Sequence, residues 1–334
     1  MTPDFSRQVG VERMKAVVYD RFGPPDVLHL RDLPTPRPDD DEVLIRIRAT
    51  TVTAAEADMR RGRPLWGRVI IGFVRPRRRM RVLGTELAGV IESVGNDVTR
   101  FRPGDEVFGF AGFRIGANAE YMRLGEAASL CIKPGNTSFE EAAAAVDGAS
   151  TALFFLKDKA RIRSGDRVLI VGASGSVGSY GVQLAAHFGA EVTGVCSTRN
   201  VDFVKSLGAK RVIDYTRDDF TQANELYDIV FDTAGKSSFA ACRGTLASGG
   251  RYVATTGLAN YVLAFCTRLG PGKRVVTGMS VDKSEALPYL RSLIEDGRLR
   301  IVIDRCYSME DIVEAHRYVD SGHKRGNVAI KVAD

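Results

Sequence analysis

A segment of small residues after an apolar run offers main-chain groups that can bind phosphate. Residues 168–171 are Val-Leu-Ile-Val, an apolar run typical of a buried strand. They are followed by Gly-Ala-Ser-Gly-Ser-Val-Gly, which ends at Gly178. Such glycines also mark ordinary turns, but between a strand and a helix they let the main chain approach a pyrophosphate. The helix start adds free N–H groups and a positive dipole end. A dinucleotide site is predicted that includes Ser174, Gly175, Ser176, Val177 and Gly178.

The residues after the next predicted strand bear on which dinucleotide binds. An enzyme that uses NAD places Asp or Glu about 20 residues beyond the loop, to accept a hydrogen bond from the ribose 2′-hydroxyl. Here that stretch reads Cys-Ser-Thr-Arg-Asn at 196–200, without an acid. Hydroxyls and a guanidinium can bind a 2′-phosphate instead. NADPH is therefore the predicted cofactor, with Ser197, Arg199 and Asn200 in its site, although Ser197, Thr198 or Asn200 could instead cap the next helix.

Three further turns follow predicted strands of the same region. They comprise residues 233–235, 255–257 and 278–280. Doubly wound sheets bind their ligands at the carboxyl ends of the strands. Gly235, Thr256 and Gly257 are therefore predicted to contact the cofactor, although ordinary turn chemistry explains these residue types equally well.

The elements that must position these residues follow two rhythms. Short alternating segments separated by Gly and Pro predict a barrel-like β domain, with strands at 15–19, 27–33, 42–51, 83–93, 105–110, 120–124 and 129–133. Strands that alternate with helices then predict a doubly wound parallel α/β sheet, with strands at 167–171, 191–195, 211–213, 228–232, 251–255 and 274–278. The tail predicts a helix from Ser284, a strand at 301–303, a helix from Met309 and a last strand at 328–332.

Length and composition indicate a globular protein of two domains. The 334 residues are 44% hydrophobic and 26% charged, which suits a packed core under a polar surface. No apolar run approaches the roughly 18 residues of a membrane helix, and residues 1–13 do not resemble a signal peptide, so we interpret them as a flexible tail. The five cysteines are widely spaced, which argues against a disulfide framework and favours a reducing, cytoplasmic location.

The basic charge is concentrated in one segment. The chain has a formal net charge of +6, and residues 60–81 carry nine arginines and no acid. A solvated loop at the mouth of the active-site cleft is the preferred interpretation. Trp66, Val69 and Phe73 lie among the arginines, so weak contact with an anionic membrane is a second hypothesis. A nucleic-acid partner is disfavoured, because the basic residues do not spread as a stripe over a domain.

Several motifs occur in an order that resembles one enzyme family. They are Gly-Pro-Pro-Asp-Val-Leu at 23–28, Gly-Thr-Glu-Leu-Ala-Gly-Val-Ile at 84–91, Phe-Arg-Pro-Gly-Asp-Glu-Val at 101–107, the nucleotide loop, Leu-Gly-Ala at 207–209, Val-Ile-Asp-Tyr at 212–215 and Gly-His at 322–323. Together they resemble the medium-chain dehydrogenase/reductase superfamily, specifically its zinc-free quinone oxidoreductase, or zeta-crystallin-like, branch. The resemblance covers the chain from Met14 to its end.

The resemblance implies an architecture and an assembly. A GroES-like catalytic domain is expected from residues 14–147 and 284–334, a Rossmann domain of residues 148–283 is inserted between them, and a homodimer is expected. Zinc enzymes of the superfamily hold their catalytic metal with a Cys and a His of the first domain. Here no cysteine precedes Cys131, and Thr85 stands in place of the histidine. Since a zinc site needs three or four ligands, we expect no metal.

The resemblance also implies an activity. It places Thr53 where the family has an asparagine beside the nicotinamide, makes Thr53 and Thr151 the candidate catalytic hydroxyls, and puts Tyr215 beside the adenosine phosphate. The implied reaction is NADPH-dependent hydride transfer to a small-molecule quinone or α,β-unsaturated carbonyl, which needs no metal. Reduction of another carbonyl or alkene stays open, as does a weakly catalytic NADPH-binding sensor or adaptor.

Other reactive side chains are expected to play structural roles. Glu56 could relay a proton, but we expect it to be solvated or paired with Arg60 or Arg61. His316, on a predicted helix, is expected at the surface or in a packing contact. Cys196 is interpreted as a small buried hydrophobe rather than a reactive thiol.

Overall fold

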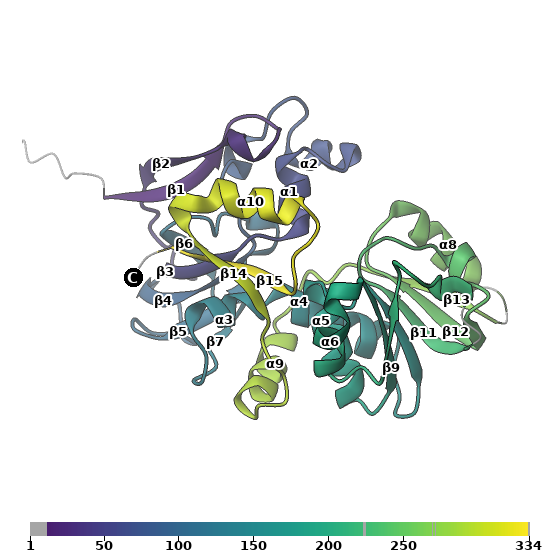
Figure 1. Ribbon diagram of the computed structural model, residues 1–334. Helices are drawn as coiled ribbons and strands as arrows, with labels where there is room; N and C mark the ends of the chain where they lie inside the picture. Colours follow the sequence, from purple (N-terminus) through teal and green to yellow (C-terminus); the bar gives the residue numbers. More distant parts are fainter. Residues whose placement is uncertain (1–11, 223–224, 269, 271, 333–334) are drawn as a thin grey trace, which may run out of the picture.

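The computed structural model describes residues 12–222, 225–268, 270 and 272–332. Figure 1 shows them as two lobes: a β lobe, which contains both ends of the described chain, and an α/β lobe, which is built from its middle. The sheet of the β lobe is mostly antiparallel, and that of the α/β lobe is parallel. The predicted fold class is therefore confirmed. Residues 1–11 of the predicted flexible tail lie outside the described residues.

The β lobe is a sheet completed by the end of the chain. Its strand order is β14-β15-β3-β4-β5-β7, with β6 paired to β3, while β1 and β2 form a separate hairpin. The apolar alternation predicted at 42–51 is confirmed, because Val43, Ile45 and Ile47 are fully buried in one cluster. The strands are β1 (Arg13–Tyr19), β2 (Leu28–Pro34), β3 (Glu42–Thr51), β4 (Glu86–Val94), β5 (Glu106–Phe110), β6 (Tyr121–Gly125), β7 (Ser129–Ile132), β14 (Ile303–Ser308) and β15 (Asn327–Lys331).

One predicted strand is wrong in its position. The sequence places it at 301–303, whereas β14 begins at Ile303 and runs to Ser308. Ile301 and Val302 pack against the core of the α/β lobe, so their apolar character reflects that contact rather than a place in a sheet. The residues of β14 are half-buried or exposed, which explains why no apolar alternation marks this strand.

The α/β lobe has the doubly wound sheet that the sequence predicts. Its parallel strands follow the order β10-β9-β8-β11-β12-β13. Because β8 is first in sequence but central in the sheet, the strand order reverses between β8 and β11, and such a switch point is where these sheets bind ligands. The strands are β8 (Arg167–Val171), β9 (Glu191–Cys196), β10 (Arg211–Asp214), β11 (Tyr227–Asp232), β12 (Leu246–Ala254) and β13 (Arg274–Thr277), and the helices are α4 (Asp147–Leu153), α5 (Ser176–His187), α6 (Val201–Ser206), α7 (Phe239–Cys242) and α8 (Leu258–Arg268).

The helices of the β lobe tie its two chain segments together. Helix α3 begins with a capping box at Ser138. In this motif a serine and a glutamate exchange reciprocal hydrogen bonds that satisfy main-chain N–H groups at the helix start. Helix α1 packs on α10. The fully buried Arg60 of α1 donates from Nη2 to Oδ2 of Asp320 in α10 at 2.6 Å. Within the described residues, no helix is long and apolar enough to cross a bilayer. The helices are α1 (Ala54–Arg60), α2 (Arg68–Ile71), α3 (Phe139–Ala144), α9 (Ala286–Glu295) and α10 (Ile312–Asp320).

Helix α9 lies at the junction of the lobes. Leu290, Leu293 and Ile294 join the core of the α/β lobe, while Leu287 joins a cluster with the alanines of α3. Since α9 contacts both cores, the domain boundaries predicted at 147–148 and 283–284 stay predictions.

Candidate functional site

The predicted nucleotide loop joins β8 to α5 at the switch point of the parallel sheet. Gly172 adopts a φ of +80°, and Gly175 is the N-cap of α5, with no side chain to bond the N–H groups of the first turn. At Gly178 an added Cβ would lie 2.1 Å from the Gly172 carbonyl oxygen, so only glycine lets the helix approach the strand this closely. The 12-residue helix α5 therefore presents uncapped N–H groups and its positive end, as a pyrophosphate requires.

The turn before β15 closes against this loop from the β lobe. The Gly326 N–H donates to the Ser174 carbonyl oxygen at 2.8 Å. Ser176 Oγ donates to Asn327 Oδ1 at 2.5 Å. Both lobes therefore hold the loop in place, and the Ser176 side chain is occupied, which leaves the main chain of Ser176 and Val177 for a ligand.

Polar side chains after β9 meet the same loop. Asn200 Nδ2 donates to Ser174 Oγ at 3.0 Å and to Ser197 Oγ at 3.3 Å, and Arg199 Nη2 donates to the His323 carbonyl at 2.9 Å. Neither Ser197 nor Asn200 caps the following helix through its side chain, so the capping interpretation is wrong for both. Asn200 Oδ1 is buried without a hydrogen-bond partner among the described residues. A buried acceptor beside a phosphate loop fits a cofactor hydroxyl.

Asp214 lies near this region, but both of its carboxylate oxygens already accept hydrogen bonds. Thr198 Oγ1 donates to Asp214 Oδ2 at 2.5 Å, and the N–H and hydroxyl of Thr216 donate to Oδ1 at 3.0 and 2.8 Å. The hydrogen bond from Thr198 is the main cause that lowers the pKa of Asp214. The carboxylate at the end of β10 thus stabilises its own turn rather than presenting free acceptors.

The remaining predicted cofactor residues lie at the carboxyl edge of the same sheet. Tyr215 follows β10 and is 58% exposed, and its N–H donates to the Cys196 carbonyl at 3.1 Å, which places it beside the end of β9. Gly235 and Thr256 lie together, because a Cβ on Gly235 would come within 2.7 Å of Thr256 Oγ1. Gly257, with a φ of +94°, follows directly. Contact of these four residues with a cofactor stays a prediction.

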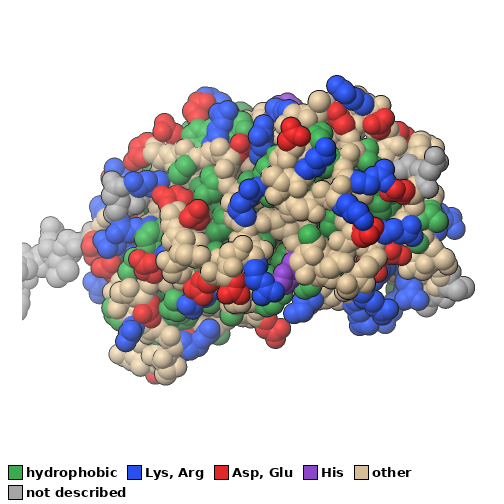
Figure 2. Space-filling view, turned by 60° about the horizontal axis from the view of Figure 1, so that its bottom comes forward, with side chains coloured by type: hydrophobic (Ala, Val, Ile, Leu, Met, Phe, Trp, Pro, Cys, Tyr) green, Lys and Arg blue, Asp and Glu red, His purple; other side chains and the backbone are tan. Residues whose placement is uncertain are grey.

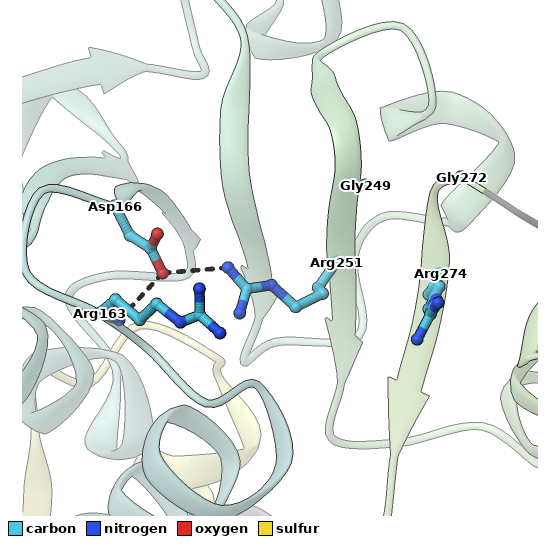
Figure 3. Close-up of a pocket in the computed structure, with 6 residues that line it drawn as sticks. All are labelled: Arg163, Asp166, Gly249, Arg251, Gly272 and Arg274. Carbon is cyan, nitrogen blue, oxygen red and sulfur yellow. Dashed lines mark hydrogen bonds and ion pairs between the residues drawn. The ribbon is translucent and has the colours of Figure 1, made fainter.

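A hollow of about 330 Å³ lies at the opposite edge of the parallel sheet. Figure 3 shows Asp166 there, with hydrogen bonds to Arg251 Nη2 and to the Arg163 main chain, both at 3.0 Å. Arg274 begins β13 and pairs in register with Arg251. Because the nucleotide loop follows the other end of these parallel strands, the hollow is not part of the candidate site.

The two candidate catalytic hydroxyls lie on different helices. Thr53 is the N-cap of α1, where its side chain accepts from the Glu56 N–H at 3.1 Å. Thr151 lies on α4, donates from Oγ1 to Asp147 Oδ1 at 3.1 Å, and accepts from Lys283 Nζ at 3.3 Å. A hydroxyl has one proton and two lone pairs, so Thr151 keeps one acceptor position for a ligand.

Thr151 belongs to a buried ionic cluster that sequence reasoning missed. Lys283 is fully buried, and its Nζ lies 2.7 Å from Asp147 Oδ1. Glu86 is also buried, and its carboxyl group accepts from the Asp147 N–H at 2.5 Å and from the Thr51 hydroxyl. Burial and the neighbouring Asp147 charge raise the pKa of Glu86 well above its usual range. Glu86 lies in a motif noted from the sequence, whereas no local pattern marks Lys283.

Glu56 and His316 are buried between α1 and α10. Glu56 is 2% exposed and accepts from Asn118 Nδ2 at 2.5 Å, so the expectation that it is solvated is wrong. Arg60 and Arg61, at the end of α1, bind Asp320 instead of Glu56. His316 is fully buried, with Nε2 at 3.9 Å from Glu56 Oε1, as a packing residue. Burial raises the pKa of Glu56 to about 7 and lowers that of His316 to about 3.

Cys196 and Thr85, which stands in place of the family's zinc-binding histidine, have structural surroundings. Cys196 is 1% exposed within the core of the α/β lobe, and burial raises the pKa of its thiol to about 11, which confirms a buried hydrophobe. Thr85 precedes β4, and its carbonyl accepts from the Ala111 N–H at 2.7 Å. Across the part of the chain that the structure describes, no group of three His, Cys, Asp or Glu side chains is placed to hold a metal. The expected absence of zinc stays a prediction.

Family models, related sequences and a solved structure all indicate the same kind of protein, an oxidoreductase. Residues 39–155 match the family model of the alcohol dehydrogenase GroES-like domain, and residues 207–330 match that described as zinc-binding dehydrogenase. The chain is 33% identical to the 2-methylene-furan-3-one reductase of Solanum lycopersicum, over 95% of this chain and 79% of that protein. It is 30% identical to a chloroplastic NADPH-dependent alkenal/one oxidoreductase of Arabidopsis thaliana, over 96% and 80%. The quinone oxidoreductase structure from Coxiella burnetii superimposes with a TM-score of 0.88 at 31% identity, over 96% of this chain and all of that one.

The buried Glu56 predicts a measurable pH dependence of stability. The folded chain keeps this carboxyl group protonated up to about pH 7, whereas the unfolded chain ionises it near 4.5, so its contribution is full below pH 4.5 and is lost as the pH rises through 7. His316 has the opposite sign, with a contribution that is present above 6.5 and lost toward 3. We expect Glu56→Gln to gain about 3 kcal/mol of unfolding free energy relative to wild type between about pH 4.5 and 7.5.

Urea denaturation of both proteins across this pH range measures the difference directly. The exposed Glu92 provides the matched control, since Glu92→Gln removes a carboxylate without removing a buried one. Its curve should run parallel to that of wild type. A Glu56→Gln curve that also runs parallel would show that Glu56 ionises equally in the folded and unfolded chains.

Proposed function

Because this chain belongs to the medium-chain dehydrogenase/reductase superfamily, in its quinone oxidoreductase-like branch, we propose that it uses NADPH to reduce a quinone or an α,β-unsaturated carbonyl. The observation that carries the proposal is the uncapped start of α5 at the switch point, with Asn200 and Arg199 beside it. The names of the relatives support an activated alkene or a quinone as acceptor, since they include reductases of furanones, alkenals and quinones.

The preference for NADPH rests on charge. Arg199 donates from Nη2 to the His323 carbonyl, and its other N–H groups remain to bind a 2′-phosphate. Asp214 uses its oxygens on Thr198 and Thr216, so it is not offered to a ribose 2′-hydroxyl as the acid of an NAD site would be. Asn200 Oδ1 is the buried acceptor for a neighbouring cofactor hydroxyl.

The side chains around Thr151 would orient a bound cofactor. The nicotinamide cofactor supplies the hydride. The Thr151 hydroxyl donates to Asp147 and accepts from Lys283, so its remaining lone pair would be free to accept a hydrogen bond from the amide of a bound nicotinamide. Thr53, at the start of α1, supplies the second hydroxyl. The full burial of Lys283 restricts the movement of the groups that it binds.

We also propose a homodimer in the cytoplasm. Helix α8 exposes Tyr261, Val262 and Phe265 next to β13, which pairs with β12 alone among the described strands. Pairing of two copies along the open edge of β13 would cover these side chains. A reducing compartment suits the cysteines, all five of which are free.

Turnover tests the activity. We expect NADPH absorbance to fall when quinones or short enones are added to the purified protein, at a rate well above that with NADH. Prior incubation with a chelator serves as the control for metal and should leave the rate unchanged. Tight NADPH binding without turnover on any acceptor would contradict the reductase and favour a sensor or adaptor, whereas faster oxidation of NADH would contradict the cofactor preference.

Arg199 tests the 2′-phosphate site separately. In Arg199→Ala, we expect the KM for NADPH to rise about tenfold, because one charge-assisted contact contributes about 1.4 kcal/mol, while the KM for NADH stays the same. Arg298→Ala, at an exposed arginine after α9, is the matched control and should change neither constant. An equal rise for both cofactors in Arg199→Ala would assign the residue to general support of the loop.

Thr151 tests the orienting hydroxyl. Thr151→Val should lower kcat/KM about tenfold through loss of one hydrogen bond, and Thr151→Ser should restore most of it, since Lys283 and Asp147 can hold either hydroxyl. Thr277→Val removes a hydroxyl that donates to the Ala254 carbonyl within the sheet and provides the control for structural loss. Equal activity of the valine and serine variants would remove Thr151 from the site.

A further inference from the structure

The structure divides the nine arginines of residues 60–81 into two groups. Arg60 and Arg61 both bind Asp320, and Arg81 binds Asp20 at 3.0 Å. Arg68 lies over the Phe22 ring at 5.0 Å and donates to the Gly62 carbonyl. These four arginines serve the fold of the β lobe, so the expectation of a wholly solvated loop is wrong for them.

The other five lie on the surface of the arginine segment, which we define as residues 63–79. None of the five forms an ion pair with a described acid, and Arg77 donates to the Val69 carbonyl at 2.9 Å. All five side chains are exposed, namely Arg63, Arg75, Arg77, Arg78 and Arg79. By contrast, the face in Figure 2 carries acidic and basic side chains together over most of its area.

Large apolar side chains stand exposed between these arginines. Phe73 is 75% exposed and Val74 is 86% exposed. The others are Leu65, Val69 and Ile70, with exposures of 72%, 62% and 49%. Exposed aliphatic and aromatic side chains of this number in one short segment mark a surface that binds something apolar.

The segment is fixed so that these side chains face outward. Ile71 and Met80 are buried in a small cluster beneath it, and Pro76 between them is buried as well. Gly72 has a φ of +129°, and a Cβ there would lie 2.0 Å from the Arg75 carbonyl oxygen, so a tight turn projects Phe73 and Val74. Figure 1 shows α2, which precedes this turn, at the upper edge of the β lobe, on the side toward the α/β lobe.

We propose that the arginine segment docks on the surface of an anionic lipid bilayer. Phe73 and Val74 enter the boundary between headgroups and acyl chains, and the exposed arginines bind the phosphate and carboxylate groups of the lipids. Because the turn is held by buried side chains, the protein docks with little loss of conformational freedom. The proposal is independent of the reductase activity.

Lipid fits this surface better than other anionic partners do. A nucleic acid would use the guanidinium groups but would leave five aliphatic or aromatic side chains against phosphates and water. Helix α8 is a useful contrast, because it exposes Val262 and Phe265 with a single basic residue, Arg268, in its last turn. An apolar face without flanking cations suits a second copy of this chain, whereas alternating apolar and cationic side chains suit an anionic membrane.

Vesicle flotation tests the proposal on the full-length protein. One set of vesicles contains phosphatidylcholine alone, and the other contains phosphatidylserine as one lipid in five. We expect partitioning onto the anionic vesicles at least about tenfold stronger than onto the neutral ones, and a steep loss of binding in high salt. Equal recovery from both kinds of vesicle would overturn the proposal.

Variants separate the two components of the surface. Phe73→Ser with Val74→Ser should weaken binding at every salt concentration, and Arg78→Glu with Arg79→Glu should abolish the preference for anionic lipid. Arg102→Glu with Arg298→Glu changes the net charge equally at exposed positions elsewhere, and it should leave binding near the wild-type level. If this control loses binding as fully as the segment variant, attraction is a property of net charge and the docking surface is wrong.

Competition identifies the partner class. A short duplex DNA at the same phosphate concentration should displace little protein from anionic vesicles. Complete displacement, together with unchanged DNA binding in the Phe73→Ser and Val74→Ser variant, would assign the arginines to nucleic acid and overturn the lipid proposal. Circular dichroism of each variant, matched to wild type, confirms that the compared proteins are folded.

Discussion

The candidate site depends on how closely the start of α5 lies against the end of β8. With hydrogen as its side chain, Gly178 lets the helix pass the Gly172 carbonyl at a distance that any Cβ would prevent. The same approach aims the uncapped N–H groups of the helix at the switch point. The β lobe then fixes the loop from the outside, through Gly326 on Ser174 and Asn327 on Ser176. The candidate phosphate site is thereby assembled from two lobes, although its sequence signature lies in one.

The chain buries its charged groups in two different ways. Lys283 and Asp147 form a direct pair, which offsets part of the desolvation that burial imposes on each charge. Glu86 and Glu56 lie in places where no cation is in direct contact, and their pKa values rise with burial, so protonation relieves the cost of a buried charge. His316 follows the same logic, since burial keeps it neutral. Protonation state, rather than pairing, makes most of these polar groups compatible with a packed interior.

Local patterns carried the sequence predictions, and long-range contacts limited them. The alternation of Val43, Ile45 and Ile47, and the loop ending at Gly178, are set by neighbours along the chain, so their placement could be predicted. The partners of Glu86 and Lys283 come from distant segments: Asp147 lies 61 residues from Glu86 and Thr151 lies 132 residues from Lys283. Likewise, nothing in the sequence of the short helix α1 indicates that α10 will cover Glu56. The strand near residue 301 was misplaced for the same reason, because its apolar residues serve a core in the other lobe.

The charge balance around Thr151 bears on the class of ligand proposed for it. Lys283 is matched by Asp147, and Glu86 favours its neutral form, so the cluster around Thr151 carries little net charge at neutral pH. A carboxylate or phosphate on a substrate would find no surplus cation in this cluster, and a cationic substrate would find no surplus anion. An uncharged carbonyl compound bound there, as proposed, would meet hydroxyls and nearly neutral surroundings, where its oxygen gains from hydrogen bonds without first losing a strongly held hydration shell. Quinones and enones have this property, so the charge balance around Thr151 and the names of the relatives support the same proposed class of acceptor by separate routes.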